Sequence, residues 1–184
     1  MKKLLILTGD MATGKSTFSA ILSKRYNIEY SSKDIIKEKL VDKYGYANRE
    51  ENRKLSLIAV QQIIDLFSKK AKRGESFICE ANFHDFEIDQ LCDIAEANGY
   101  KSFVLLFTAD LKILFERSQA RISSGTRHKA HIHEELQNFE DFKKLLLDRR
   151  KVNPNHHLIN VNCDDFSYQT DNKFLSLLDN FFDE

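Results

Sequence analysis

The chain has 184 residues, a length that suits one compact domain with a full hydrophobic core. Its 28 Lys and Arg residues balance its 28 Asp and Glu residues, so net charge does not favour nucleic acid as a partner, although a local basic patch would suffice. Three cysteines without a CxxC pair argue against a disulfide framework or zinc knuckle. No apolar run suits a signal peptide or a membrane span, so we expect a cytoplasmic protein without a membrane partner.

Short apolar runs alternate with longer helical patterns along the chain, which is typical of a parallel sheet with helical crossovers. The first run, Leu4 to Leu7, is continuously apolar, as expected of a central strand buried on both faces. Further strands are predicted at residues 28–31, 76–79, 102–107 and 157–161. Helices are predicted at residues 14–25, 34–43, 50–72, 85–98, 111–122, 131–150 and 172–182.

These elements predict a single α/β domain, residues 1–184, with five parallel strands in a doubly wound sheet. In such sheets ligands bind at the carboxyl ends of the strands. Residues 123–126, Ser-Ser-Gly-Thr, interrupt the helical pattern after the fourth strand. We expect the surrounding segment, about residues 117–133, to form a lid over the ligand.

The strongest motif is a phosphate loop between the first strand and the first helix. Residues 9–16 match GxxxxGK[ST] without a mismatch. In this motif backbone N–H groups and the helix N-terminus face the phosphates, Lys15 neutralises the β- and γ-phosphates, and the Ser16 hydroxyl reaches Mg²⁺. The sequence therefore predicts binding of ATP with Mg²⁺. The predicted ATP-binding residues of the loop are Gly9, Asp10, Met11, Ala12, Thr13, Gly14, Lys15, Ser16 and Thr17.

Two carboxylates follow predicted strands and so lie at the same edge of the sheet as the loop. Asp34, just past the second strand, could accept the proton of an attacking hydroxyl, or could simply complement the dipole of the next helix. Glu80 ends the third strand, as in a Walker B arrangement, and is expected to share Mg²⁺ with Ser16. A solvated charge at a strand end is the alternative for Glu80.

Three arginines lie on or beside the expected lid. Arg117 and Arg121 are four residues apart and share one helix face, and Arg127 follows the break in the helical pattern. Guanidinium groups on a mobile segment could close over ATP and stabilise the transferring phosphoryl group. We therefore predict ATP contacts for Arg117 and Arg127 and a catalytic role for Arg121, against the alternative of an ordinary surface helix. His128, His131 and His133 match no common zinc pattern and are interpreted as polar lid residues.

Taken together, these motifs resemble the small P-loop kinases of the polynucleotide-kinase-like and zeta-toxin-like group, classed broadly among AAA-type ATPases and predicted kinases. The resemblance covers about the first three quarters of the chain and implies an adenylate-kinase-like fold with phosphotransfer from ATP to a hydroxyl. Asp34-Ile35-Ile36-Lys37 is similar to the family's Asp-x-x-Arg, whose Asp is the general base. The residues after Arg117 are similar to the family's lid motif Arg-x-x-x-Arg, whose second Arg, here Arg121, is catalytic.

The third strand is similar to a family strand that ends in Asp-x-Asn, which implies metal or substrate contacts for Glu80 and Asn82. Asp34, Lys37 and Asn82 are thus the implied substrate-binding residues. Two departures stand out. Lys37 occupies the position of an Arg that grips the acceptor's phosphate, and Lys cannot make a bidentate contact, which weakens a nucleic-acid 5′-hydroxyl as acceptor. Glu80 stands where Asp is usual, which changes the geometry at the metal.

Three functions remain open at this point. The first is a kinase acting on a hydroxyl of a small molecule, a nucleoside or a nucleic-acid 5′ end, with Lys15, Asp34 and Arg121 as the catalytic residues. The second is a nucleotide kinase with a phosphate acceptor, held by the arginines between the second and third strands: Arg49, Arg53 and Arg73. The third is a regulatory P-loop ATPase without an acceptor.

Overall fold

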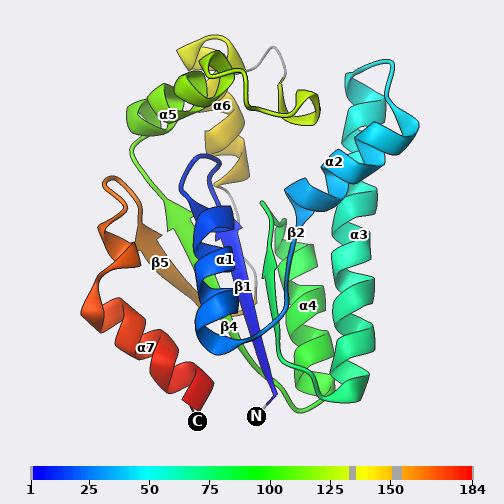
Figure 1. Cartoon of the computed structure of the whole chain (residues 1–184), viewed down its shortest axis with the longest axis vertical. Helices are drawn as coiled ribbons and strands as arrows, with labels where there is room; N and C mark the ends of the chain where they lie inside the picture. Colours follow the sequence, from blue (N-terminus) through cyan, green and yellow to red (C-terminus); the bar gives the residue numbers. More distant parts are fainter. Residues whose placement is uncertain (1, 133–135, 151–154, 184) are drawn as a thin grey trace.

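The computed structural model describes residues 2–132, 136–150 and 155–183, and its core is one five-stranded sheet. All strand pairs are parallel, in the order β2-β3-β1-β4-β5 (Figure 1). The strands are β1 (Lys3–Gly9), β2 (Tyr30–Ser32), β3 (Phe77–Glu80), β4 (Lys101–Thr108) and β5 (Leu158–Asn162). This is the predicted fold class, with every predicted strand present.

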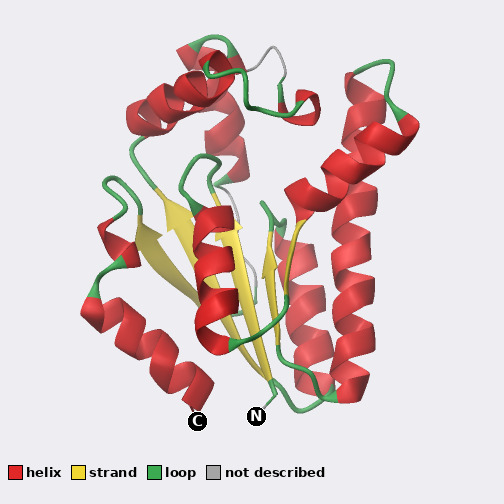
Figure 2. Ribbon diagram, in the orientation of Figure 1, coloured by secondary structure: helices red, strands yellow, loops and turns green. Residues whose placement is uncertain are grey.

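Helices connect the strands and cover both faces of the sheet (Figure 2). They are α1 (Lys15–Tyr26), α2 (Lys33–Tyr44), α3 (Arg49–Arg73), α4 (Asp85–Ala97), α5 (Leu111–Ser123), α6 (Phe139–Arg149) and α7 (Asn172–Asp183). The 3₁₀ turns η1 (Lys129–His131) and η3 (Ser167–Gln169) lie in the connections between these elements. None of the helices in the described residues combines the length and the apolar character that a bilayer crossing would need.

The two faces of β1 explain why its sequence is continuously apolar. Leu4 and Ile6 pack with α3 and α4 in one hydrophobic cluster, whereas Leu5 and Leu7 pack with α1, α6 and α7 in the other. Successive side chains of a strand point to opposite faces, so a central strand needs apolar residues at every position. All four leucine and isoleucine side chains are fully buried.

Helix α6 corrects the predicted helix at residues 131–150. His131 belongs to the 3₁₀ turn η1, and α6 begins only at Phe139. The side chain of Asn138 accepts a hydrogen bond from the Asp141 backbone N–H at 2.9 Å, which caps the helix. The periodicity of the apolar residues extended the prediction too far toward the N-terminus, because it gave this cap no weight. Residues 133–135, including His133, lie outside the described part of the chain.

The strand order decides which loops meet. Because β3 lies between β1 and β2, the residues that follow these three strands converge at one edge of the sheet. There β1 leads into the phosphate loop, β2 into Asp34, and β3 into Asn82. Helices α5 and α6 lie above this edge, and α2 stands across from them (Figure 1).

Candidate active site

The phosphate loop runs from the end of β1 into α1, and its two glycines are required by close contacts. A Cβ atom on Gly9, at φ +110°, would lie 2.3 Å from the carbonyl oxygen of Phe107 on β4. One on Gly14, at φ +87°, would lie 2.8 Å from the Tyr168 hydroxyl. Both positions therefore combine a positive φ with a neighbour that leaves no room for a side chain.

Lys15, the first residue of α1, folds back over its own loop and is buried. Its ammonium donates to the carbonyl oxygen of Gly9 at 3.2 Å, to the carbonyl oxygen of Asp10, and to Oγ1 of Thr13 at 3.4 Å. Burial lowers the pKa of Lys15, and the carboxylates of Glu80, Asp34 and Asp10 act in the opposite direction. The ammonium is thus held at the centre of the loop among groups that keep it close to where a phosphate would bind.

Glu80 joins the phosphate loop to β2 through its carboxylate. Its Oε2 accepts hydrogen bonds from the hydroxyls of Ser16, at 3.0 Å, and Ser32, at 2.7 Å. Glu80 is buried, whereas Ser16 is exposed. A hydroxyl and a carboxylate in contact are oxygen donors of the kind that Mg²⁺ prefers, and Mg²⁺ typically takes one or two protein ligands and completes its shell with phosphate and water. The donors therefore fit the ion that the phosphate loop implies.

Asp34 lies in the first turn of α2 and lines a cleft that is also lined by the start of the phosphate loop. Half of its side chain is exposed, but it is exposed to a cleft crowded by cations. Burial by surrounding protein works to raise the pKa of Asp34, but nearby Lys33, His131, Lys15 and Lys37 outweigh it and lower that pKa below the usual 3.8. Asp34 is consequently an ionised carboxylate at neutral pH.

His131 links Asp34 to the lid segment. Its Nδ1 lies 3.8 Å from Oδ1 of Asp34, and its Nε2 lies 3.0 Å from Oε1 of Glu38, one turn further along α2. Burial lowers the pKa of His131, with Lys37 adding to the effect, while Asp34 and Glu38 oppose it. His128 makes a similar pair with Asp42, Nε2 to Oδ1 at 3.1 Å. These histidines contact carboxylates of α2, and within the described residues no group of three or more His, Cys, Asp or Glu side chains is arranged to hold a metal.

The turn η1 is docked on α2 and α3 by hydrogen bonds to its backbone. The carbonyl oxygen of Ala130 accepts from Lys37 Nζ at 2.9 Å and from Asn52 Nδ2 at 3.2 Å. Lys37, implied above as a substrate-binding residue, is therefore buried beneath the lid segment with its ammonium on a lid carbonyl. Burial, then Lys33, lowers the pKa of Lys37 to about 8, with Arg49 and Arg149 contributing and Asp34 opposing.

The three lid arginines have different surroundings. Arg127 lines the cleft and donates from Nε to the carbonyl oxygen of His131 at 3.1 Å. Burial lowers the pKa of Arg127, as does the charge of Arg121, against the effect of Asp34. Arg121 itself is exposed and is not among the residues that line the cleft. Arg117 points to the loop after β5, where it donates to the carbonyl oxygens of Cys163, at 2.7 Å, and Asp164, at 2.6 Å.

Two arginines at the end of α6 are connected to the phosphate loop, Arg150 directly and Arg149 through Asn82, and the sequence did not predict either contact. Arg150 donates to both carboxylate oxygens of Asp10 and to the carbonyl oxygen of Ala109. With the Asn82 amide oriented to satisfy its neighbours, its nitrogen donates to the carbonyl oxygen of Gly9 at 3.0 Å, and its oxygen accepts from Arg149 Nη1 at 3.1 Å. The adjacent Arg-Arg pair was the available signal, but two cations in the last turn of a helix are also ordinary dipole partners.

The Arg150–Asp10 pair predicts a loss of stability when the arginine is removed. Arg150→Met leaves the Asp10 carboxylate, only 3% exposed, without its partner. Because Arg150 itself is 29% exposed, we expect a loss of about 2 kcal/mol, between the values for surface and for buried pairs. Urea unfolding measures it. The control is Arg25→Met, which removes an equally bidentate but exposed pair with Asp179 and should cost much less.

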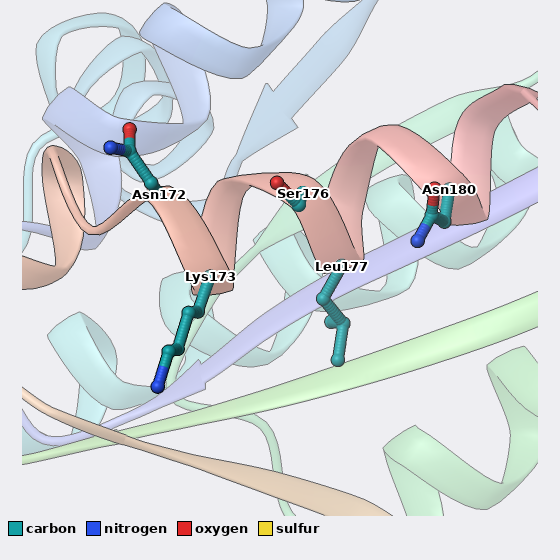
Figure 3. A pocket seen from close by; sticks show the side chains of 5 residues that line it. All are labelled: Asn172, Lys173, Ser176, Leu177 and Asn180. Atoms are coloured by element: carbon teal, nitrogen blue, oxygen red, sulfur yellow. The ribbon is translucent and has the colours of Figure 1, made fainter.

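A cleft of about 940 Å³ extends from the start of the phosphate loop to α2, α3 and the end of α6, whereas Lys15, Ser16 and Glu80 are not among the residues that line it. That volume is within the range of ligand sites, and its polar lining contains the predicted residues Gly9, Asp10, Met11, Asp34, Lys37, Asn82 and Arg127. A second hollow lies on the surface of α7 (Figure 3). This hollow is open to solvent and is lined by residues of α7 alone, of which only Lys173 is charged. It therefore lacks the set of charged and polar groups that lines the cleft beside the phosphate loop.

Comparisons with known proteins agree with this fold. The profile of a family described as the AAA domain matches residues 4–143. No curated protein matches the chain. A solved structure from Chloroflexus aurantiacus J-10-fl, described as a "putative kinase", is 24% identical with a TM-score of 0.83, and the match covers 98% of each chain.

Two further solved structures are a sugar kinase from Janibacter sp. HTCC2649 and shikimate kinase from Aquifex aeolicus VF5. The first is 12% identical with a TM-score of 0.62, covering 97% of this chain and 95% of the other. The second is 17% identical with a TM-score of 0.57, covering 96% of each. At these identities the likeness shows the fold alone, which is that of the P-loop kinases.

Proposed function

Given that the chain belongs to the AAA domain family, we propose that it is an ATP-dependent phosphotransferase that moves the γ-phosphate of ATP to a hydroxyl of its acceptor. The observation that carries the proposal is the position of Asp34. Its ionised carboxylate lies in the cleft that is also lined by the start of the phosphate loop, Gly9 to Met11. A P-loop protein that only hydrolyses or senses ATP has no need of a cleft that extends this far past the loop.

In the proposed reaction the acceptor's hydroxyl oxygen forms a bond to the γ-phosphorus. The bond from that phosphorus to the β,γ-bridging oxygen breaks, ADP leaves, and the hydroxyl proton passes to the Asp34 carboxylate. Lys15 holds the β- and γ-phosphate oxygens, and Ser16 with Glu80 would hold Mg²⁺. When bound, Mg²⁺ neutralises charge on the phosphates. Arg127, already in the cleft, is placed to contact the transferring group.

Arg121 is exposed and outside the cleft, so its proposed catalytic role requires that the lid moves and carries its side chain into the cleft. Its exposed side chain is close enough to lower the pKa of Arg127, so a shift of the lid would bring it to the cleft. Arg149, which lines the cleft from the end of α6, is a second source of a guanidinium for the phosphoryl group. We therefore propose that Arg121 and Arg149 share the stabilisation of the phosphoryl group, a role that the sequence assigned to Arg121 alone.

Arg117 is proposed to bind ATP through the loop that it holds. Its guanidinium lies 3.9 Å from the centre of the Phe166 ring, and Phe166 in turn packs against Gly14 of the phosphate loop. These planar groups beside the loop offer a stacking surface for the nucleobase. Membership of the polynucleotide-kinase-like and zeta-toxin-like group is part of the same proposal, and it is supported by the order of the motifs along the chain.

A second candidate function is a kinase for a phosphate acceptor. Arg49 and Arg53 line the cleft, as that function requires, but Arg73 lies at the other end of α3, near Glu75. A phosphate acceptor needs no strong base, so this candidate leaves Asp34 without a role. We therefore favour the hydroxyl.

The test is a transfer screen with γ-labelled ATP and Mg²⁺ over nucleosides, nucleotides, oligonucleotides with 5′-hydroxyl ends, sugars and hydroxy acids. We expect label in a phosphorylated product of at least one hydroxyl compound, at a rate above the release of labelled phosphate. Label that appears only in inorganic phosphate, whichever compound is present, would favour a regulatory ATPase. Transfer only to phosphate groups would favour the second candidate.

A further inference from the structure

The wall of the cleft opposite the phosphate loop is one face of α3. Arg49 and Arg53 lie one turn apart at its start, and Ser56, Leu57 and Val60 continue the same face. Arg53 and Leu57 are exposed to the cleft. This wall therefore presents a cation first and an apolar surface next to it.

Positive charge is in excess in the cleft. Seven Lys and Arg side chains line it against five carboxylates, although the whole chain is balanced. Near the loop, Asp10 is held by Arg150. On the far side the carboxylates have other partners: Glu50 lies 2.9 Å from Lys54, and Glu87 accepts from the His84 backbone N–H at 2.7 Å.

These cations also lower the pKa of Lys37. Burial and Lys33 lower its pKa, and Arg49 of α3 and Arg149 of α6 lower it further from both sides of the cleft. Asp34 is the carboxylate that opposes them. An anion bound between α3 and α6 would relieve this repulsion.

ATP is poorly placed to be that anion. β2 is separated from β1 by β3, so the backbones of these two strands are two strand spacings, about 10 Å, apart. Asp34 lines the same cleft as the loop and the start of α3, and its negative charge disfavours a phosphate chain that would extend past it. The cations of α3 thus belong to the acceptor's half of the cleft.

We propose that the acceptor is a small hydroxylated acid, whose anionic group is bound by Arg53 while its hydroxyl is presented to Asp34. The proposal rests on the proposed function, since it names the acceptor class of that reaction. Arg53 can bind a carboxylate or a phosphate with two parallel hydrogen bonds. Leu57, Val60 and Phe83 provide the apolar surface for the carbon skeleton between the two ends. The hydroxyl oxygen gains the γ-phosphoryl group, ADP leaves, and Asp34 takes the proton.

The experiment compares hydroxyl compounds that differ only in the anion: glycerol, glycerate and glycerol 3-phosphate, and likewise ribose, ribonate and ribose 5-phosphate. Each is given with γ-labelled ATP to the wild type, to Arg53→Gln and to Arg73→Gln. We expect transfer to the acids in preference to the neutral compounds. Arg53→Gln should lower kcat/KM for the acids about 10- to 100-fold, the usual worth of a charged hydrogen bond, mainly through KM. The carboxylate and phosphate arms show which anion is used.

Arg73→Gln is the matched control, because Arg73 is on the same helix but outside the cleft, and it should behave as the wild type. Equal transfer to neutral and acidic compounds, or no effect of Arg53→Gln, would overturn the proposal while the kinase function stands. If no compound accepts label, titration calorimetry with the Mg²⁺–ADP-loaded protein measures whether the acids bind, independently of transfer. Binding of the acids that depends on Arg53 keeps the anion site without the kinase function, and absence of such binding overturns the site.

Discussion

Replacing Lys15 by alanine is expected to abolish phosphoryl transfer, with a loss of at least a hundredfold to a thousandfold in kcat, the range seen when one preorganised donor to a transition-state anion is removed. The ammonium is buried at the centre of the loop and is held by the carbonyl oxygens of Gly9 and Asp10. In the absence of nucleotide these contacts keep the charge in place, so little reorganisation is needed when the phosphates arrive.

The measurement is the initial rate of transfer from γ-labelled ATP, together with the thermal shift produced by Mg²⁺–ATP. Both should be lost in Lys15→Ala. Lys24→Ala, an exposed lysine in the last turn of α1, is the matched control and should keep both. A Lys15→Ala protein that retains wild-type transfer would show that the nucleotide binds elsewhere.

Replacing Asp34 by asparagine is expected to reduce transfer by about 10² to 10⁴-fold, the usual contribution of a general base, while ATP binding persists. The change keeps the size of the side chain and removes only the charge that accepts the proton. Asp42→Asn is the matched control: this carboxylate is on the same helix and also faces a histidine, but it does not line the cleft. Turnover of Asp34→Asn equal to that of the wild type would reject Asp34 as the base.

The pH dependence of the wild type gives a second view of Asp34. Because nearby cations hold the pKa of Asp34 below its usual 3.8, the carboxylate stays ionised as pH falls, and loss of the base should begin only below that value. His131 is the second titrating group beside this carboxylate. Its pKa lies below the usual 6.5, and its protonation adds a positive charge 3.8 Å from Asp34. We therefore expect a weak acid limb below pH 6.5 that is absent in His131→Gln, and a steep one below pH 3.8 that is absent in Asp34→Asn.

The site residues that could be predicted from the sequence are those whose role is indicated by the residues next to them in the chain. The phosphate loop is one, because a strand, two glycines, a lysine and a helix must be consecutive for the backbone to enclose a phosphate. Asp34 and Glu80 are others, since Asp34 comes two residues after the second strand and Glu80 ends the third. The roles proposed for these residues stay predictions until the variants are measured.

The residues that could not be found depend on contacts across the chain. Arg150 reaches Asp10 over 140 positions, and Arg53 faces the cleft only because α3 packs beside the sheet edge. Lys37 was predicted as a substrate contact by its place in a motif; the structure places it at the cleft and also shows a hydrogen bond from its ammonium to the carbonyl oxygen of Ala130, which the motif gave no sign of. A helix pattern shows that a side chain lies on a face and says nothing of what that face meets.

The sequence by itself determined the α/β fold class and the phosphate loop, because hydrophobic period and backbone conformation are local properties that short segments carry with them. Only the tertiary structure decided the rest of the site. The strand order β2-β3-β1 brings Asp34 and Glu80 to Lys15, and the packing of α3 and α6 around that edge places their arginines in the cleft. That order and that packing arise from burial of both faces of the sheet at once, which no single segment encodes.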